Sequence, residues 1–344
     1  MKISYVKTID AVGKMLSHDV TRIVRGKSKG PAFKKGHVIS KEDIPLLLDI
    51  GKEHICFLDL DQDELHEDDA ALILASSVAG EGLALKGPSE GKYDLVASCN
   101  GLLKVDVEGL IKINSLPEVV MASLHTNSPV IEGEFVAGTR VIPLAVKQEI
   151  IDEAKKVVFE HGPLIRVLEY QPCKMGVLIT GREIFDGRIK DTFAPVLKEK
   201  AAAYGLAEPL LDYAPDDAGL IASGIKALLD QDCGLVVVTG GMSVDPDDVT
   251  PAGIRLSGAE VKKYGAPVLP GAMFLLAYHE QVPVVGVPAC GMFFKTTVFD
   301  LILPRLLAGE KMDGSKIAAL GHGGYCRRCE PCRYPDCSFG KGVL

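Results

Sequence analysis

This sequence of 344 residues has neither a net positive charge nor a long apolar run, and its first residues do not resemble a secretory leader. It has 46 Asp and Glu residues against 38 Lys and Arg residues, which gives a formal net charge of −8. Proteins that bind nucleic acid broadly neutralise its phosphates with a basic face, so this charge argues against that class. No run approaches the roughly 18 apolar residues that a membrane helix needs. The N-terminal MKISYVKTIDAVGKM has no apolar core, so we expect no signal peptide, no membrane partner and a cytoplasmic protein.

The length and composition are those of a globular protein with more than one domain. Domains usually contain about 100–200 residues, so two or three are expected. Hydrophobic residues make up 47% and charged residues 24% of the sequence, which argues against a mainly disordered or collagen-like chain. We find no internal repeat and no low-complexity tract.

Charge and turn residues divide the first half of the chain into three predicted segments. Residues 1–86 are predicted to form an α+β segment, which is basic at first and then strongly acidic. Residues 87–150 contain short apolar stretches separated by Asn-Gly, Glu-Gly or Ala-Gly, which predicts a β-rich segment. Residues 109–115, GLIKINS, are one of its predicted strands. Residues 151–171 are predicted to form a connecting helix.

Strand and helix patterns alternate over residues 172–309. Near-continuous apolar strands in such an alternation indicate a parallel sheet covered by helices on both faces. We therefore predict an α/β domain of three layers, α/β/α, with a mostly parallel sheet. Its predicted strands are residues 174–180, 207–213, 234–239 and 282–288, and its predicted helices are residues 191–205, 216–231, 248–258 and 292–309.

Glycine, hydroxyl and acidic residues follow these predicted strands. Ligands bind outside the carboxyl ends of the strands in open parallel sheets, so these residues mark the expected site. The loop 239–248 combines paired glycines, which let a ligand approach the backbone, with hydroxyls and with aspartates able to hold hydrated Mg²⁺. The loop also fits a tight Gly-Gly turn in which Asp248 caps the next helix. It is neither a GxGxxG nor a Walker loop, so by itself it identifies no ligand.

Five motifs in this region resemble, in order and spacing, the molybdopterin-binding domain of the molybdenum insertases (the MoeA/gephyrin type) and of the molybdopterin adenylyltransferases (MoaB/Mog-like). TGREI at 180–184 resembles the insertase TGDEL, and GRIKDTF at 187–193 resembles its glycine-to-aspartate loop. TGGMSVDPDDVTP at 239–251 is similar to the insertase SGGVSVGxxD and to the adenylyltransferase TGGTGxxPRDVTP. Pro270-Gly271 and Gly286-Val287-Pro288 occupy the places of two later motifs.

The resemblance implies a role for each matching residue. Glu183, Asp191 and Asp248 would position Mg²⁺ or activate a phosphate linkage, as catalytic residues of a molybdopterin molybdotransferase-like activity. The implied ligands are molybdopterin or its adenylylated form, and molybdate. The implied function is in molybdenum cofactor biosynthesis, in metal insertion or cofactor maturation for a molybdoenzyme. The residues implied to bind the cofactor are Thr180, Gly181, Thr239, Gly240, Gly241, Ser243, Pro270, Gly271, Gly286 and Pro288.

Departures from the insertase pattern leave alternatives open. Arg182 replaces the first acid of TGDEL, and Ala272-Met273 stand where the insertases have Lys-Pro. With these changes the chain would be a non-catalytic molybdopterin carrier, chaperone or regulator that docks a molybdoenzyme through its C-terminal tail. A pyrophosphatase or deamidase on the same domain is a third hypothesis. Asp191 also fits a helix cap, and Cys290 fits an inert buried thiol.

Four of the nine cysteines lie close together in the segment 310–344, and the other five are scattered. Four thiolates at the spacing CxxCxxCx₄C can hold one Zn²⁺ or one iron–sulfur cluster. Glycines and prolines around them oppose a helix, so we expect a metal-binding tail that is disordered without metal and separable from the α/β domain. A redox-sensitive tail without metal is the alternative. The predicted metal ligands are Cys326, Cys329, Cys332 and Cys337.

We also expect a homodimer. The N-terminal segments are short, and a strongly basic stretch is followed by a strongly acidic one. Such segments can hardly form a hydrophobic core of their own. The resemblance implies a cofactor cleft between two subunits, in which the cations of residues 22–35 would complete the neighbouring site.

Overall fold

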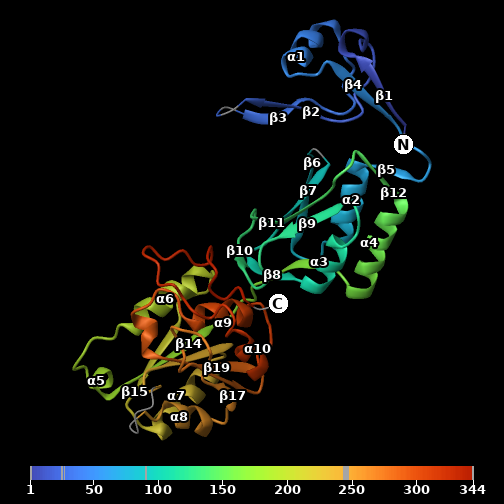
Figure 1. Cartoon of the computed structure of the whole chain (residues 1–344). Helices are drawn as coiled ribbons and strands as arrows, with labels where there is room; N and C mark the ends of the chain where they lie inside the picture. Colours follow the sequence, from blue (N-terminus) through green and yellow to red (C-terminus); the bar gives the residue numbers. More distant parts are fainter. Residues whose placement is uncertain (1, 25, 27, 90, 243–247, 343–344) are drawn as a thin grey trace. The chain divides into compact units, whose positions relative to one another are not determined.

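A computed structural model describes residues 2–24, 26, 28–89, 91–242 and 248–342 (Figure 1). The chain divides into two compact units, each built from separate stretches of sequence. Unit 1 contains Met1–Ser98, Val105–Leu124 and Glu132–Arg166, and unit 2 contains Cys99–Lys104, His125–Ile131 and Val167–Leu344. Whether the five predicted segments fold on their own stays a prediction.

Unit 1 consists of short antiparallel strands and helices. Strands β6, β7, β11 and β9 form one sheet in that order, while β1 pairs with β4, β2 with β3, and β5 with β12. Its elements are Lys2–Lys7 (β1), Val20–Val24 (β2), Ser28–Phe33 (β3), Ile44–Asp49 (α1), His54–Asp59 (β4), Glu64–His66 (β5), Glu67–Val78 (α2), Leu83–Ser89 (β6), Lys92–Ala97 (β7), Val107–Asn114 (α3), Val119–Ser123 (β9), Phe135–Val141 (β11), Ala145–Lys147 (β12) and Gln148–His161 (α4). Three other strands, most of whose residues belong to unit 2, form a separate sheet in the order β10-β8-β13: Gly101–Val105 (β8), Pro129–Val130 (β10) and Ile165–Glu169 (β13).

The predicted strand at residues 109–115 is wrong, because most of this segment lies in helix α3. The Oδ1 atom of Asp106 accepts the backbone N–H of Gly109 at 2.9 Å and so caps the helix. Gly109 and Ile113 are its buried residues. Their spacing of four is that of one helix face and not the two-residue period of a strand.

The predicted connecting helix is shorter than expected. Helix α4 ends at His161, and Gly162 follows with φ 77°, a conformation that favours glycine and ends the helix. Residues Ile165–Glu169 then form strand β13.

Unit 2 contains the predicted α/β domain. Its elements are Met175–Thr180 (β14), Arg182–Phe185 (α5), Phe193–Ala203 (α6), Leu210–Ala214 (β15), Ala218–Leu229 (α7), Leu235–Thr239 (β16), Thr250–Leu256 (α8), Glu260–Tyr264 (β17), Leu275–His279 (β18), Val282–Val287 (β19), Val298–Leu307 (α9) and Gly314–Ala319 (α10). The expected helix at residues 292–309 begins only at Val298, where Thr297 and Asp300 form a capping box.

One sheet of unit 2 has the strand order β15-β14-β16-β19-β18-β17. Strands β15, β14, β16 and β19 are parallel, and β18 and β17 are antiparallel. The predicted α/β fold with a mostly parallel sheet is therefore confirmed. The sequence pattern does not predict β17, which is a half-exposed edge strand rich in charged residues, and it also does not predict the buried strand β18 beside it.

Helices cover both faces of this sheet. Along β14, Met175, Val177 and Ile179 pack in one core cluster, together with residues of α6, α9 and α10. Leu178, which points to the opposite face, packs in a second cluster with residues of α7 and α8. This alternation is the two-residue period of a strand between two helical layers.

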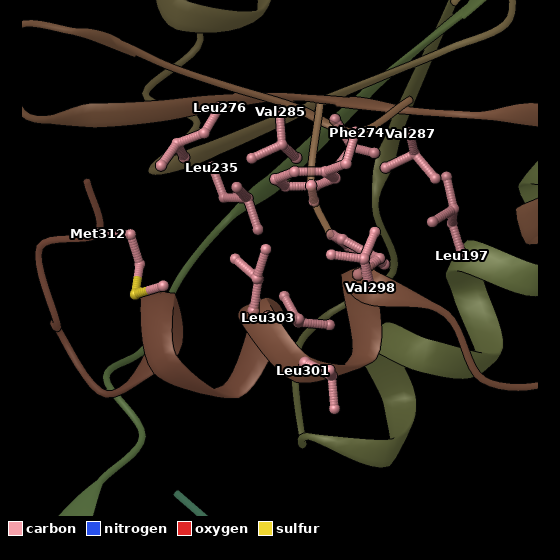
Figure 2. Packing of buried hydrophobic residues seen from close by; sticks show 14 of the residues in the cluster. Leu197, Leu235, Phe274, Leu276, Val285, Val287, Val298, Leu301, Leu303 and Met312 are labelled. Carbon is pink, nitrogen blue, oxygen red and sulfur yellow. The ribbon is translucent and has the colours of Figure 1, made fainter. Parts of the chain in front are cut away.

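The larger cluster joins the sheet to the C-terminal part of the chain. Figure 2 shows Leu235, Leu276 and Val285 on its sheet side, above Val298 and Leu303 of α9. Met312, Ile317, Leu320 and Phe339, which follow α9 in the sequence, are buried in the same cluster. Residues 310–344 therefore contribute to the core of unit 2.

No helix in the described part of the chain is long and apolar enough to cross a membrane.

Candidate functional site

The carboxyl ends of the parallel strands bring several predicted residues to one edge of the sheet. Ile179 of β14 pairs with Thr239 of β16, and Thr239 pairs with Val287 of β19. The chain passes from β14 outward to β15 on one side, and the later strands lie on the other side of β14. The strand order thus reverses between β14 and β16, which is where ligands bind in open α/β sheets.

Buried threonines fix the turn that leaves β16. The Thr180 hydroxyl donates to the carbonyl oxygen of Thr239 at 2.9 Å and lies 3.2 Å from the hydroxyl of Thr250. All three side chains are buried. Among the described residues, the Thr239 hydroxyl has no hydrogen-bond partner. A buried hydroxyl without a partner is uncommon in a folded protein.

The paired glycines of this turn are required by its own packing. Gly240 and Gly241 have φ values of 86° and 52°. A Cβ at Gly240 would lie 2.4 Å from the carbonyl oxygen of Thr180, and one at Gly241 would lie 2.6 Å from the Thr250 hydroxyl. From the sequence we expect Gly241→Val to abolish binding while leaving the fold intact. The substitution would also strain the turn itself, so loss of binding in this variant would not by itself locate the ligand.

A cavity of about 480 Å³ opens beside this turn. It is lined by six of the predicted residues: Gly240, Gly241, Asp248, Pro270, Gly271 and Pro288. Its other lining residues are Met242, Leu269, Ala272, Met273, Ala289, Cys290 and Arg328. Arg328 comes from the cysteine-rich tail, and no spacing or motif in the sequence indicates that it reaches this place.

Four other predicted binding residues, Thr180, Gly181, Thr239 and Gly286, are buried and do not line the cavity. Ser243 lies outside the described residues, as do Asp245 and Asp247 of the same loop.

Neither of the two acids predicted beyond β14 lines the cavity. Glu183 is exposed in helix α5. Asp191 accepts the backbone N–H of Phe193 at 2.7 Å at the start of α6, and the hydroxyl of Tyr213 donates to it at 3.3 Å. The helix-cap role considered for Asp191 is thus present, and a catalytic role for either acid stays a prediction.

The charged and ionisable groups at the cavity are few. Burial raises the pKa of the Cys290 thiol, which favours the neutral form. Burial raises the pKa of Tyr264, and the charge of Asp248 adds a smaller contribution in the same direction. The hydroxyl of Tyr264 donates a hydrogen bond to the carbonyl oxygen of Met242 at 3.2 Å. Among the described lining residues, Asp248 is the one acid and Arg328 the one base.

A larger cavity of about 610 Å³ lies beside α6 and the residues before α9. Lys200 and Asp300 in its wall form an ion pair with each other, and Asp300 also caps α9. Both charges therefore serve the fold. The smaller cavity at the strand ends is the better candidate because the motif residues line it.

The cysteine tail is folded against unit 2. Tyr334 donates to the carbonyl oxygen of Asp300 at 3.0 Å, and its ring meets that of Phe339 edge-on at 6.3 Å between centroids. The expectation of a tail that is separable from the α/β domain is therefore wrong. Apolar residues of the tail are buried in the same cluster as residues of the sheet and of α9.

All four tail cysteines line one small cavity of about 30 Å³. Among the described residues, however, no three His, Cys, Asp or Glu side chains are grouped so as to hold a metal ion. The predicted metal site is therefore not shown by the positions of these side chains.

Two family models match parts of this chain. Residues 176–308 match the family model described as "Probable molybdopterin binding domain". This match confirms the resemblance of the α/β domain to molybdopterin-binding domains. Residues 5–59 match a domain of unknown function.

Individual relatives are distant. A CinA-like protein of Mycobacterium marinum is 26% identical over 78 residues, which are 23% of this chain and 18% of that protein. The molybdopterin biosynthesis enzyme MoaB of Thermus thermophilus is 17% identical, with a TM-score of 0.34, covering 40% of this chain and 98% of that one. The molybdopterin biosynthesis protein MoeA of Pyrococcus horikosii is 15% identical, with a TM-score of 0.34, covering 90% of this chain and 75% of that one.

Proposed function

We propose that this chain binds molybdopterin in the cavity at the ends of β14 and β16, with the phosphate group of the ligand inside that cavity. We further propose that the chain acts in molybdenum cofactor biosynthesis. One observation carries the proposal: six motif residues converge on a single cavity where the strand order reverses. The family match of residues 176–308 supports the same class of ligand.

The residues at the cavity fit such a ligand. Arg328 offers a guanidinium group that suits a phosphate. Leu269, Met273 and Pro288 offer apolar surface for a planar ring. The turn at Gly240 and Gly241 brings backbone groups to the cavity wall with no side chain between.

In its finer form the proposal is a Mg²⁺-dependent step of metal insertion or cofactor maturation. Asp248 would hold the cation, which neutralises phosphate charge when bound. Arg328 would orient the phosphate, and the buried threonines would keep the turn rigid while the ligand is bound. Neither residue needs to exchange a proton in this arrangement.

A non-catalytic carrier is a second candidate, favoured by the positions of Glu183 and Asp191. The first is exposed and the second caps α6, so Asp248 is the one described acid at the cavity. A carrier would bind the pterin but would not convert it in the presence of molybdate and Mg²⁺. An assay of molybdate-dependent conversion by the purified chain separates the two candidates.

Ala289 gives a matched test of the binding site. It lines the cavity and is exposed, so substitutions there should leave stability within about 0.5 kcal/mol. Ala289→Glu adds a charge that repels phosphate, whereas Ala289→Gln adds almost the same volume without the charge. We expect the Glu variant to bind molybdopterin at least about tenfold more weakly than the Gln variant in equilibrium titrations. Equal affinities would contradict the placement of the phosphate here.

We also propose that the chain is a homodimer. Ile3 and Tyr5 of β1 and Ile23 of β2 are 44%, 67% and 70% exposed, which is apolar surface that a second copy would cover. Light scattering at micromolar concentration should give twice the monomer mass. A monomer would contradict this.

A further inference from the structure

The cysteine tail forms part of the wall around the candidate cavity. Leu269 donates its backbone N–H to the carbonyl oxygen of Gly324 at 2.8 Å, and Cys326 donates its N–H to the carbonyl oxygen of Leu269 at 2.9 Å. These bonds tie the tail to the backbone just before Pro270-Gly271. The position of the first tail cysteine is thus coupled to the position of the cavity wall.

Two of the four tail sulfur atoms lie beside polar groups. The backbone N–H of Arg328 lies 3.4 Å from the Sγ atom of Cys326, and the hydroxyl of Thr296 lies 3.2 Å from the Sγ atom of Cys332. Donors of this kind orient thiolate ligands and stabilise their charge. All four cysteines line one cavity, and metal binding would have to draw their sulfur atoms together, because the described side chains are not grouped as a metal site.

The conformation of Arg328 links the cysteines to the candidate cavity. Its φ of 55° is rare for a residue with a side chain and lets the chain turn tightly between Cys326 and Cys329. The guanidinium group lies over the ring of Phe294, 5.2 Å from its centroid. From there Arg328 lines the cavity that contains Gly240, as its one described basic residue.

We propose that the four tail cysteines bind one zinc ion, and that this centre holds Arg328 at the candidate cavity as the contact for the anionic group of the ligand. All four cysteines line one cavity, and four thiolates are a ligand set of structural Zn²⁺ sites. Four thiolates around Zn²⁺ carry a net charge of −2, and Arg327, Arg328 and Arg333 of the same segment offset it. Binding releases the thiol protons to solvent, and no electron is transferred.

The role of Arg328 rests on the proposed function, but the zinc centre does not. Four neutral thiols can be left in the folded tail without metal, since Tyr334 and Phe339 already anchor it. Zinc therefore adds local order around residues 326–337 and does not supply the fold of unit 2. Its removal is expected to weaken anion binding at the candidate cavity while leaving the domain folded.

The zinc centre is tested on the full chain, purified without oxygen. Elemental analysis should find one zinc per chain, reduced by at least about tenfold in Cys329→Ser, whereas Cys56→Ser, which changes a half-buried cysteine of β4, should keep it. In metal-free wild-type protein, added Co²⁺ should give the visible bands of tetrahedral thiolate coordination, a readout that requires no variant. No zinc uptake, or iron with absorbance near 400 nm, would overturn the proposal.

The positioning of Arg328 is tested by a second pair of variants. Arg328→Gln should keep the zinc and bind molybdopterin about tenfold or more weakly, because a charge-assisted hydrogen bond is lost. Lys226→Gln, which removes an exposed positive charge of α7 that lines neither the candidate cavity nor the cysteine-lined cavity, should bind as the wild type does. Equal affinities of the two variants would overturn this role. Wild-type protein that holds zinc but binds no pterin would instead refute the proposed function.

Discussion

Phe339→Ala tests whether the cysteine tail is part of the core of unit 2. The side chain of Phe339 is 3% exposed and packs in the cluster that includes Leu301 of α9 and Leu320. Truncating a buried phenylalanine costs about 3–5 kcal/mol, from lost apolar contact and from the cavity left behind. For a unit of this size the change corresponds to a fall in Tm of roughly 10 °C.

The measurement is urea unfolding of the reduced chain, followed by far-UV circular dichroism. Two units can unfold in separate transitions, so the transition that shifts in the variant is assigned to unit 2. Phe159→Ala is the matched control, since Phe159 is 92% exposed on α4 and its loss should change stability by less than about 0.5 kcal/mol. A loss below about 1 kcal/mol for Phe339→Ala would refute the packing of the tail.

Three further predictions concern charged groups. Asp248→Asn should lower Mg²⁺-dependent turnover at least about tenfold with pterin binding kept, and full activity despite EDTA would contradict the Mg²⁺ role. Glu310→Gln should destabilise unit 2 by about 3–5 kcal/mol in urea unfolding, because the substitution leaves the buried Arg305 without its carboxylate partner. Burial alone would raise the pKa of Glu310, but the hydrogen bonds and charge of Arg305 hold that pKa at about 2. Burial raises the pKa of Glu67 from 4.5 to about 7, so its stabilising contribution is present below pH 4.5 and lost as pH rises through about 7. The free energy of unfolding of unit 1 should fall over this interval, and Glu67→Gln should remove that fall; an unchanged pH profile in the variant would contradict the assignment.

The α/β domain could be predicted because its local patterns and its fold agree. Apolar strands such as β14 and β16 are buried on both faces, and the helices between them show acids or caps at their starts. The carboxyl ends of parallel strands must then lie at one edge, which brings the motif residues together without further information. The cavity lined by Gly240, Asp248 and Pro270 follows from this rule.

The rest depends on contacts between distant parts of the sequence. The sequence of helix α3 can be mistaken for a strand, because GLIKINS is short and apolar. Asp106, which caps the helix, lies outside that stretch. Arg328 reaches the cavity through the bonds between Leu269 and the tail, and no local pattern shows these. Likewise, Tyr334 and Phe339 stand among prolines, glycines and cysteines, a composition that indicates a loop and hides two core residues.

Mass spectrometry of small molecules released from the anaerobically purified full chain tests the central claim most directly. We expect a phosphate-bearing pterin in near one-to-one ratio with the wild-type chain and with Ala289→Gln, and little or none with Ala289→Glu. A folded wild-type protein that carries no pterin, and takes up none when incubated with molybdopterin, would contradict the claim that the cavity beside Gly240 and Arg328 is a molybdopterin site.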